Sequence, residues 1–125
     1  MKRVIGIGGI FFKSKNPDQI KEWYGKHLGF NISPYGTKFE FRRADNKEEM
    51  NCAVWSPFKE DSNKFEPSKK EFMLNFTVDD LAAVLAELKK EGVEIVGELK
   101  DYAEYGKFAH IMDPEGNKIE LWQPR

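Results

Sequence analysis

The chain has 125 residues, the size of one ordinary domain, and 40 % of them are apolar, which is enough for a real core. Its formal net charge is −1 with acidic and basic side chains interspersed, so no charged field favours nucleic acid or an anionic membrane surface. No stretch approaches the ~18 apolar residues of a transmembrane helix, and the single cysteine, Cys52, excludes an intramolecular disulfide. We therefore expect a cytoplasmic protein.

The first predicted elements are a strand and a helix. The run "IGIGGIFFKS" (5–14) is short, contains glycines and leads directly into a helix start, so we interpret it as a strand and not as a signal peptide. Asn16 is the expected N-cap and Pro17 occupies the first helical position. Apolar and aromatic residues then recur at helical spacing up to Leu28, and Gly29 ends the helix.

Three short β-like runs follow this helix, at 30–33, 37–43 and 50–55, with a turn at "PYG" (34–36). Cys52 lies in the last run, where a small buried hydrophobe is the expected role for it. The next segment, 56–71, is polar and interrupted by prolines, and it contains Phe58 and Phe65. It is either a linker or a lid that packs over a pocket.

The second half of the chain repeats the same order of elements. A strand at 71–78 leads to Asp79 and Asp80, which cap the helix "LAAVLAELKKEG", and Gly92 ends that helix. Strands are predicted at 93–98, 107–112 and 117–122, with the turn "DPEGN" (113–117) between the last two. Each half therefore has the pattern βαβββ, with module one at about 1–57, a connecting loop at about 58–70, and module two at about 71–125.

These motifs resemble the vicinal-oxygen-chelate superfamily, which contains glyoxalase I, bleomycin-resistance proteins and extradiol dioxygenases. The similar stretches are "NPDQIKEWYGKHLGF", "VDDLAAVLAELKKEGVEI" and "GKFAHIMDPEGNKIELWQP", and together they span essentially the whole chain. The resemblance implies an α+β fold in which two tandem βαβββ modules form a curved, partly open eight-stranded barrel with flanking helices. It also implies a ligand on the concave sheet surface, and a homodimer.

The metal enzymes of that superfamily take ligands from the first and last strands of each module. Carried onto this sequence, those positions are Gly9, Ala53, Met73 and Glu120. Ala53 and Glu120 correspond because the strand endings "NCAVWSP" and "KIELWQP" share their Trp and Pro. Only Glu120 is a suitable ligand, and one carboxylate does not hold a catalytic ion. We therefore expect no metal and no other cofactor.

The predicted hairpin places His110 beside Glu120. A turn over 113–117 pairs Met112 with Lys118, and this register places His110 opposite Glu120 on the face away from the helix. A carboxylate orients a neighbouring imidazole, which is the geometry of a general base. The same pair could instead bind a polar ligand group or form a structural hydrogen bond, so Glu120 and His110 are candidate catalytic residues.

Strand alternation predicts an apolar, aromatic chamber around this pair, which suits a small, partly planar organic ligand. Its predicted ligand-binding residues are Phe11, Trp55, Met73, Asn75, Tyr105 and Trp122. Three functions remain open, and with them the question of whether the protein is an enzyme. The first is a metal-free small-molecule-binding protein of the bleomycin-resistance type. The second is a glyoxalase-like lyase or isomerase that acts on an α-carbonyl or thioester-like substrate, with Glu120 as acid and base. The third is a degenerate structural or sensor subunit.

Overall fold

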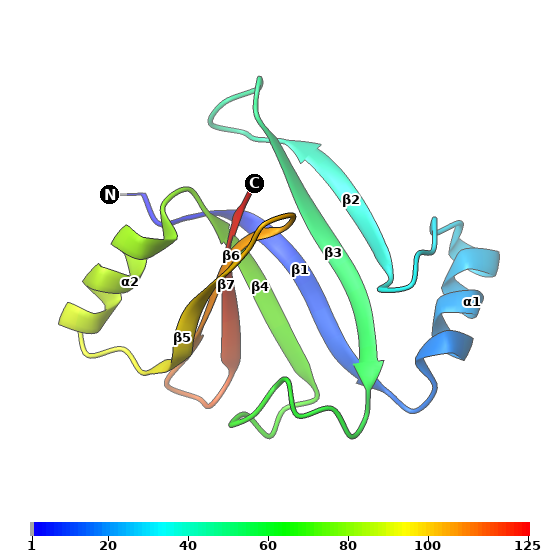
Figure 1. Ribbon diagram of the computed structural model, residues 1–125. Coiled ribbons are helices and arrows are strands. Elements are labelled where there is room, and N and C mark those ends of the chain that lie inside the picture. The colour runs from blue at the N-terminus through cyan, green and yellow to red at the C-terminus, as the bar shows by residue number, and fades with distance from the viewer. Residues whose placement is uncertain (1) are drawn as a thin grey trace.

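A computed structural model describes residues 2–125 and shows one seven-stranded mixed sheet with two helices (Figure 1). The first half contains β1 (Val4–Ser14), α1 (Pro17–Leu28), β2 (Thr37–Arg42) and β3 (Met50–Lys59). The second half contains β4 (Phe72–Val78), α2 (Leu81–Lys90), β5 (Ile95–Tyr102), β6 (Gly106–Met112) and β7 (Lys118–Pro124). No helix in the described part of the chain is long and apolar enough to cross a membrane.

The strand order β2-β3-β1-β4-β7-β6-β5 gives the two halves the same internal arrangement. In each half the first and last strands are parallel neighbours, β1 with β3 and β4 with β7, and the chain between them contains a helix and at least one further strand. The halves join where β1 and β4 pair antiparallel. The sheet is strongly curved, with α1 outside one end and α2 outside the other, and β2 and β5 remain as separate edges. The predicted α+β fold is therefore confirmed.

One predicted strand is missing, which is why the sheet has seven strands and not eight. Residues 30–33 form no strand, and only an isolated bridge joins Ser33 to Gly36. These two residues exchange backbone hydrogen bonds of 2.7 and 3.1 Å around Pro34 and Tyr35. The backbone N–H and C=O of Ser33 are used by this tight turn, so they are not available to a neighbouring strand.

The predicted helix signals act as expected. The Asn16 side chain accepts a hydrogen bond from the Gln19 N–H, and Asp80 caps α2 in the same way through Ala83. Gly29 ends α1 with φ at 72°, in the left-handed region that glycine adopts without strain.

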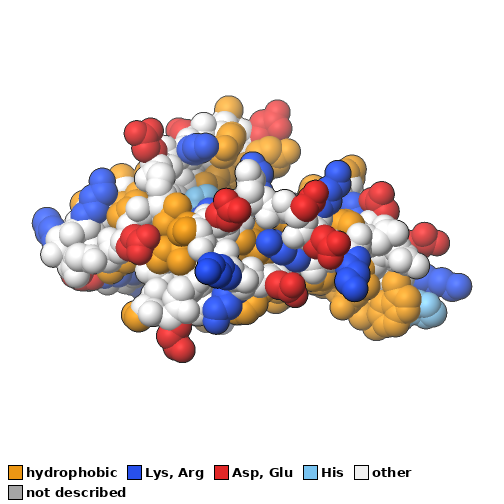
Figure 2. Space-filling view, turned by 90° about the horizontal axis from the view of Figure 1, so that it is seen from below, with side chains coloured by type: hydrophobic (Ala, Val, Ile, Leu, Met, Phe, Trp, Pro, Cys, Tyr) orange, Lys and Arg blue, Asp and Glu red, His pale blue; other side chains and the backbone are white. Residues whose placement is uncertain are grey.

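The main core lies between α2 and the outer face of the second half-sheet. Leu81 is fully buried there, and Phe76 packs at the edge of the same cluster. The other buried members of this core are Val78, Val84, Leu85, Ala109 and Leu121. Helix α1 has no buried residue, and Trp23 and Leu28 on it are at least half exposed. Figure 2 shows hydrophobic side chains gathered on the surface at the α1 end of the molecule.

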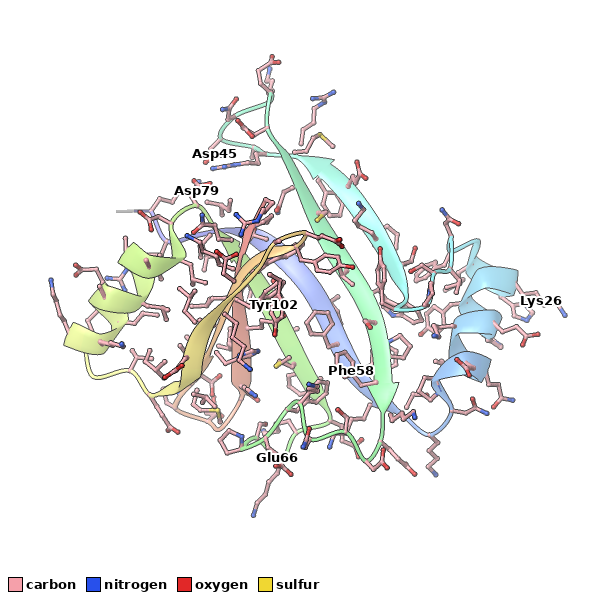
Figure 3. The ribbon with its side chains drawn as sticks, viewed as in Figure 1. Lys26, Asp45, Phe58, Glu66, Asp79 and Tyr102 are labelled. Carbon is pink, nitrogen blue, oxygen red and sulfur yellow. The ribbon has the colours of Figure 1, made fainter. Side chains whose placement is uncertain are left out.

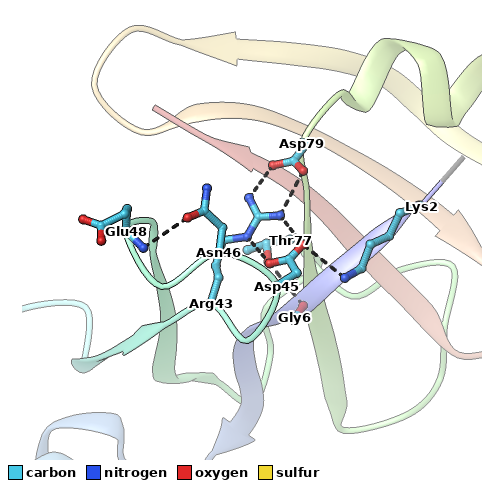
Figure 4. Close-up of polar contacts among 8 residues, drawn as sticks. All are labelled: Lys2, Gly6, Arg43, Asp45, Asn46, Glu48, Thr77 and Asp79. Carbon is cyan, nitrogen blue, oxygen red and sulfur yellow. Dashed lines mark hydrogen bonds and ion pairs between the residues drawn. The ribbon is translucent and has the colours of Figure 1, made fainter.

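A polar clamp joins the two halves at one end of the sheet (Figure 4). Arg43, just after β2, donates to Asp45 at 2.7 Å and to Asp79, at the start of α2, at 2.8 Å. Lys2 reaches Asp45 as well, at 3.1 Å. Hydrogen bonds from Arg43 and Lys2 hold the pKa of the Asp45 carboxyl well below its usual range. The clamp therefore fixes the β2–β3 hairpin against the second half.

Candidate functional site

Strand alternation on β6 and β7 separates a core face from a concave face. Ala109, Ile111, Ile119 and Leu121 belong to the core beneath α2. The residues between them point to the opposite, concave side. On β6 and β7 these are Phe108, His110, Lys118, Glu120 and Trp122, all of which line a cavity.

Two adjoining cavities occupy the concave side, with volumes of about 630 and 510 Å³. Phe11, Tyr105, Phe108 and Glu120 line both of them, so the cavities meet at the Glu120 carboxylate. Figure 3 shows Phe58 from β3 and Tyr102 from β5, which both line the first cavity, pointing into the space that the sheet encloses. Lys26 on α1 points away from it.

Both oxygens of the Glu120 carboxylate are held by protein donors. Asn75 Nδ2 donates to Oε1 at 2.7 Å, and His110 Nε2 lies 2.8 Å from Oε2. These contacts follow from the register, because Glu120 pairs with Asn75 on β4 and with His110 on β6. The predicted pairing of His110 with Glu120 is thus confirmed. The Glu120 side chain is 15 % exposed, so it is largely shielded but opens to the cavities.

Asn75 is the polar anchor of this cluster. The residue is 1 % exposed, and its Oδ1 has no hydrogen-bond partner among the described residues. A Cβ at Gly8 would come within 2.2 Å of that oxygen, so only glycine leaves room for the amide. A β-bulge between Ile7 and Gly9 brings Gly8 to this place. The glycine run of β1 thus accommodates the polar cluster.

Five of the six predicted ligand-binding residues, together with His110 and Glu120, line the cavities. The five are Phe11, Met73, Asn75, Tyr105 and Trp122. Trp122 also stacks on Phe108 and donates its Nε1–H to the Tyr105 carbonyl at 2.8 Å.

Trp55 is the exception, because it faces α1 and lines neither cavity. Its ring packs on Tyr24 at 4.4 Å and on Phe30 at 5.1 Å between centroids. On β3 the cavity-lining residues are Cys52, Val54, Ser56 and Phe58, so Trp55 lies on the other side of the strand. Trp55 and Trp122 therefore face opposite sides of the sheet, although the two strand endings look alike.

This difference corrects one of the positions carried over from the superfamily. Gly9 pairs with Val54, and Asn75 pairs with Glu120, in the equivalent parallel ladders of the two halves. The counterpart of Glu120 is therefore Val54 and not Ala53, and the residue beside Glu120 on β4 is Asn75. Matching the Trp and Pro shifted the alignment by one residue, which exchanges the faces of a strand.

The residues at these positions do not fit a divalent ion. Gly9 and Val54 have no ligand atom, and both Glu120 oxygens are engaged by Asn75 and His110. Within residues 2–125 no cluster of three or more His, Cys, Asp or Glu side chains could hold a metal ion. The chemistry available here is that of a carboxylate, an imidazole and an amide.

Several cavity residues were not among the sequence-based predictions, and three of them are Phe58, Phe108 and Lys118. Phe108 lies two residues before His110 on the same strand face, so alternation alone could have found it. Phe58 lies beyond the predicted end of its strand, because β3 continues to Lys59. A lysine at a strand end is usually solvent-exposed, but Lys118 is buried here.

The segment between the halves packs against one end of the first cavity. Phe65 is fully buried and contacts Phe58 with a centroid distance of 5.1 Å, in a small cluster with Phe11 and Met73. Asn63 and Lys64 of the same segment line the cavity. Phe65 thus packs onto the protein, whereas Phe58 belongs to β3 and not to the connecting segment.

Two titratable groups of the cavity walls have shifted pKa values. Burial lowers the pKa of the Lys118 ammonium, and the negative charge of Glu120 opposes that effect. Burial raises the pKa of the Cys52 thiol, so this side chain remains a protonated, apolar part of the wall.

A family model agrees with this fold. The model of the glyoxalase/bleomycin resistance protein/dioxygenase superfamily matches residues 6–121. No curated protein matches the sequence.

Solved structures with the same fold include two methylmalonyl-CoA epimerases. The enzyme from Mycobacterium tuberculosis has a TM-score of 0.65 at 22 % identity, covering 100 % of this chain and 91 % of its own. A Streptomyces coelicolor variant in complex with 2-nitronate-propionyl-CoA has a TM-score of 0.71 at 17 % identity, covering 97 % and 98 %. A chain described as NAD-dependent benzaldehyde dehydrogenase from Legionella pneumophila has a TM-score of 0.59 at 15 % identity, covering 94 % and 98 %. At these identities the likeness establishes the fold alone.

Proposed function

The chain belongs to the glyoxalase/bleomycin resistance protein/dioxygenase superfamily, and from this premise we propose that it binds a small organic molecule on its concave face without a catalytic metal. The observation that carries the proposal is the pair of adjoining cavities that meet at the shielded Glu120 carboxylate. Phe11, Phe108 and Trp122 give the walls large planar surfaces. Such a chamber, with a few convergent polar groups, is typical of a ligand site.

A thermal-shift series tests this binding. Ligands of the native state raise the unfolding temperature, and phenylpyruvate and its methyl ester are suitable probes because each joins an aromatic ring to a carbonyl group. We expect at least one of them to raise the midpoint in protein stripped of metal. If neither compound nor any related aromatic carbonyl compound does so, the binding proposal fails and the structural or sensor role is favoured.

Metal analysis tests the other part of the proposal. Protein purified without chelator is expected to contain far less than one equivalent of zinc, nickel, iron or manganese. A stoichiometric content of any of these ions, lost with Glu120→Ala, would contradict a metal-free site.

A second candidate function is proton transfer by Glu120. The Asn75 and His110 contacts hold the carboxylate in a fixed position where the two cavities meet. A carboxylate so placed can take a proton from a carbon beside a ligand carbonyl and return it, with His110 stabilising the charge changes at Oε2. The epimerases that share the fold give this candidate indirect support.

Hydrogen–deuterium exchange separates this candidate from binding alone. The two hydrogens at C3 of phenylpyruvate lie beside its carbonyl, and their exchange in D₂O is followed by proton NMR. We expect the protein to accelerate exchange over buffer, and Glu120→Gln to abolish that acceleration while phenylpyruvate still raises the unfolding temperature. Equal exchange rates with wild type and with Glu120→Gln would exclude Glu120 as the base.

We further propose a homodimer and a cytoplasmic location. Apolar side chains on the outer face of the β1–β4 seam are exposed, including Ile10 at 48 % and its cross-strand partner Leu74 at 37 %. Covering them with a second copy removes apolar surface from water. Light scattering is expected to give twice the 14.5 kDa chain mass, and Ile10→Lys to give the monomer mass.

A further inference from the structure

Lys118 is a buried cation beside the proposed site. It stands two residues before Glu120 on β7, so both side chains emerge on the concave face, and both line the first cavity. The residue is 8 % exposed. Its Nζ donates to the Lys64 carbonyl oxygen at 2.8 Å.

The ammonium group has no anionic partner in the part of the chain that the structure describes. No Asp or Glu oxygen there lies within 4.0 Å of its Nζ, including those of Glu120. An ammonium has three N–H donors, and the Lys64 carbonyl takes one of them. Glu120 and Glu66 act on this charge only from a longer distance. A buried charge without a direct ion pair is costly, and proteins usually keep such a group where something else completes its contacts.

We propose that Lys118 binds an anionic oxygen of the ligand, so that the first cavity selects carbonyl compounds that also carry a carboxylate. This inference rests on the binding function proposed above and adds the ligand class. Lys118 holds the carboxylate, and the aromatic walls hold the apolar part. Glu120 is left to face the carbon beside the carbonyl, since two carboxylates repel each other at close range.

The charged residues of the cavity wall agree with a preference for an anionic ligand. Three lysines line the first cavity against two glutamates: Lys64, Lys100 and Lys118 against Glu98 and Glu120. Among the lysines, Lys118 is the buried one, so its charge is the least screened by water and salt.

Lys118 also fixes the segment between the halves through Lys64, and the experiment must separate the two roles. Lys118→Met removes the charge and the hydrogen bond. Lys118→Gln removes the charge but retains an N–H donor for the Lys64 carbonyl. A role confined to anchoring the segment changes stability, whereas an anion-binding role changes the preference between a carboxylate and its ester.

The dissociation constants of phenylpyruvate and methyl phenylpyruvate are therefore measured by calorimetric titration for wild type, Lys118→Met and Lys118→Gln. We expect wild type to prefer the anion by roughly ten- to a hundredfold, the range of a charge-assisted hydrogen bond, and both variants to lose that preference. Lys89→Met removes one charge from the exposed end of α2 and is expected to behave as wild type.

Each other outcome overturns the inference. If wild type binds the ester as well as the anion, or if both Lys118 variants keep the preference, the cavity is a ligand site but Lys118 is not its anion receptor. If Lys89→Met loses the preference as well, the effect belongs to net charge. If wild type binds neither compound, the inference fails, and the binding function fails with it only when no related aromatic carbonyl compound raises the unfolding temperature either.

Discussion

The two halves of the sheet have the same strand arrangement but contribute unequally to the core and to the candidate site. The second half carries the main core, beneath α2, and also the polar cluster of Asn75, His110 and Glu120. The first half has an α1 without buried residues and supplies apolar walls to the cavities through Phe11, Val54 and Phe58. Of two modules with the same fold, one can therefore hold the main core and the polar cluster, while the other supplies cavity walls.

Matched leucine substitutions give the largest expected contrast between the halves. Leu81→Ala, in the α2 core, should lower the free energy of unfolding by about 2–5 kcal/mol because it leaves a cavity in packed surroundings. Leu28→Ala on the exposed α1 should change it by about 0.5 kcal/mol or less. Urea denaturation measures both values, and equal losses would contradict the unequal division of the core.

Two glycines should respond to alanine with opposite signs. Gly8→Ala drives a Cβ against the Asn75 amide, so we expect a loss of about 1–3 kcal/mol from overpacking. Gly25→Ala in α1 meets the flexible Ile32 side chain at 3.2 Å and should gain up to about 1 kcal/mol from helix propensity. Urea denaturation measures the free energy of unfolding of both variants. No change for Gly8→Ala would show that the polar cluster can shift to make room for the added Cβ.

The two similar tryptophans provide a test of the ligand site itself. Trp122→Phe loses the hydrogen bond to the Tyr105 carbonyl at the cavity wall, so phenylpyruvate affinity should fall roughly fivefold. Trp55→Phe should reduce stability but leave that affinity unchanged, since Trp55 packs on α1. Titration calorimetry compares them, and a drop confined to Trp55→Phe would reverse the assignment of the two faces.

The smallest effect concerns the clamp between the halves. The lowered pKa of Asp45 means that its contribution to stability is complete above the unfolded-state pKa of about 3.9 and is lost as pH falls through the folded-state value. The stability difference between wild type and Asp45→Asn should thus be constant from pH 7 to 5 and shrink towards pH 2. A difference that persists at pH 2 would place the effect outside the Arg43 contacts.

The sequence predicts most of the second half and less of the first for a physical reason. Alternation over 106–124 is strict, and one tight turn sets the register, so His110 and Glu120 could be paired before the fold was known. The strand ending around Trp55 in the first half looks equivalent to the one around Trp122 in the second half. A shift of one residue exchanges the two faces of a strand, and nothing in the local sequence reveals which face of β3 is buried. The loss of the strand at 30–33 depends on a turn around Pro34 that competes with sheet pairing.

The placement of Glu120 has a stereochemical consequence if Glu120 is the base proposed above. Its carboxylate then reaches a bound carbon from β7, whereas Phe11 and Phe58, the β1 and β3 side chains that line the same cavity, cannot exchange protons. A prochiral CH₂ group held between them would present one hydrogen to the base and the other to an aromatic ring. Exchange should then label one hydrogen of the pair and produce a single enantiomer of the deuterated compound.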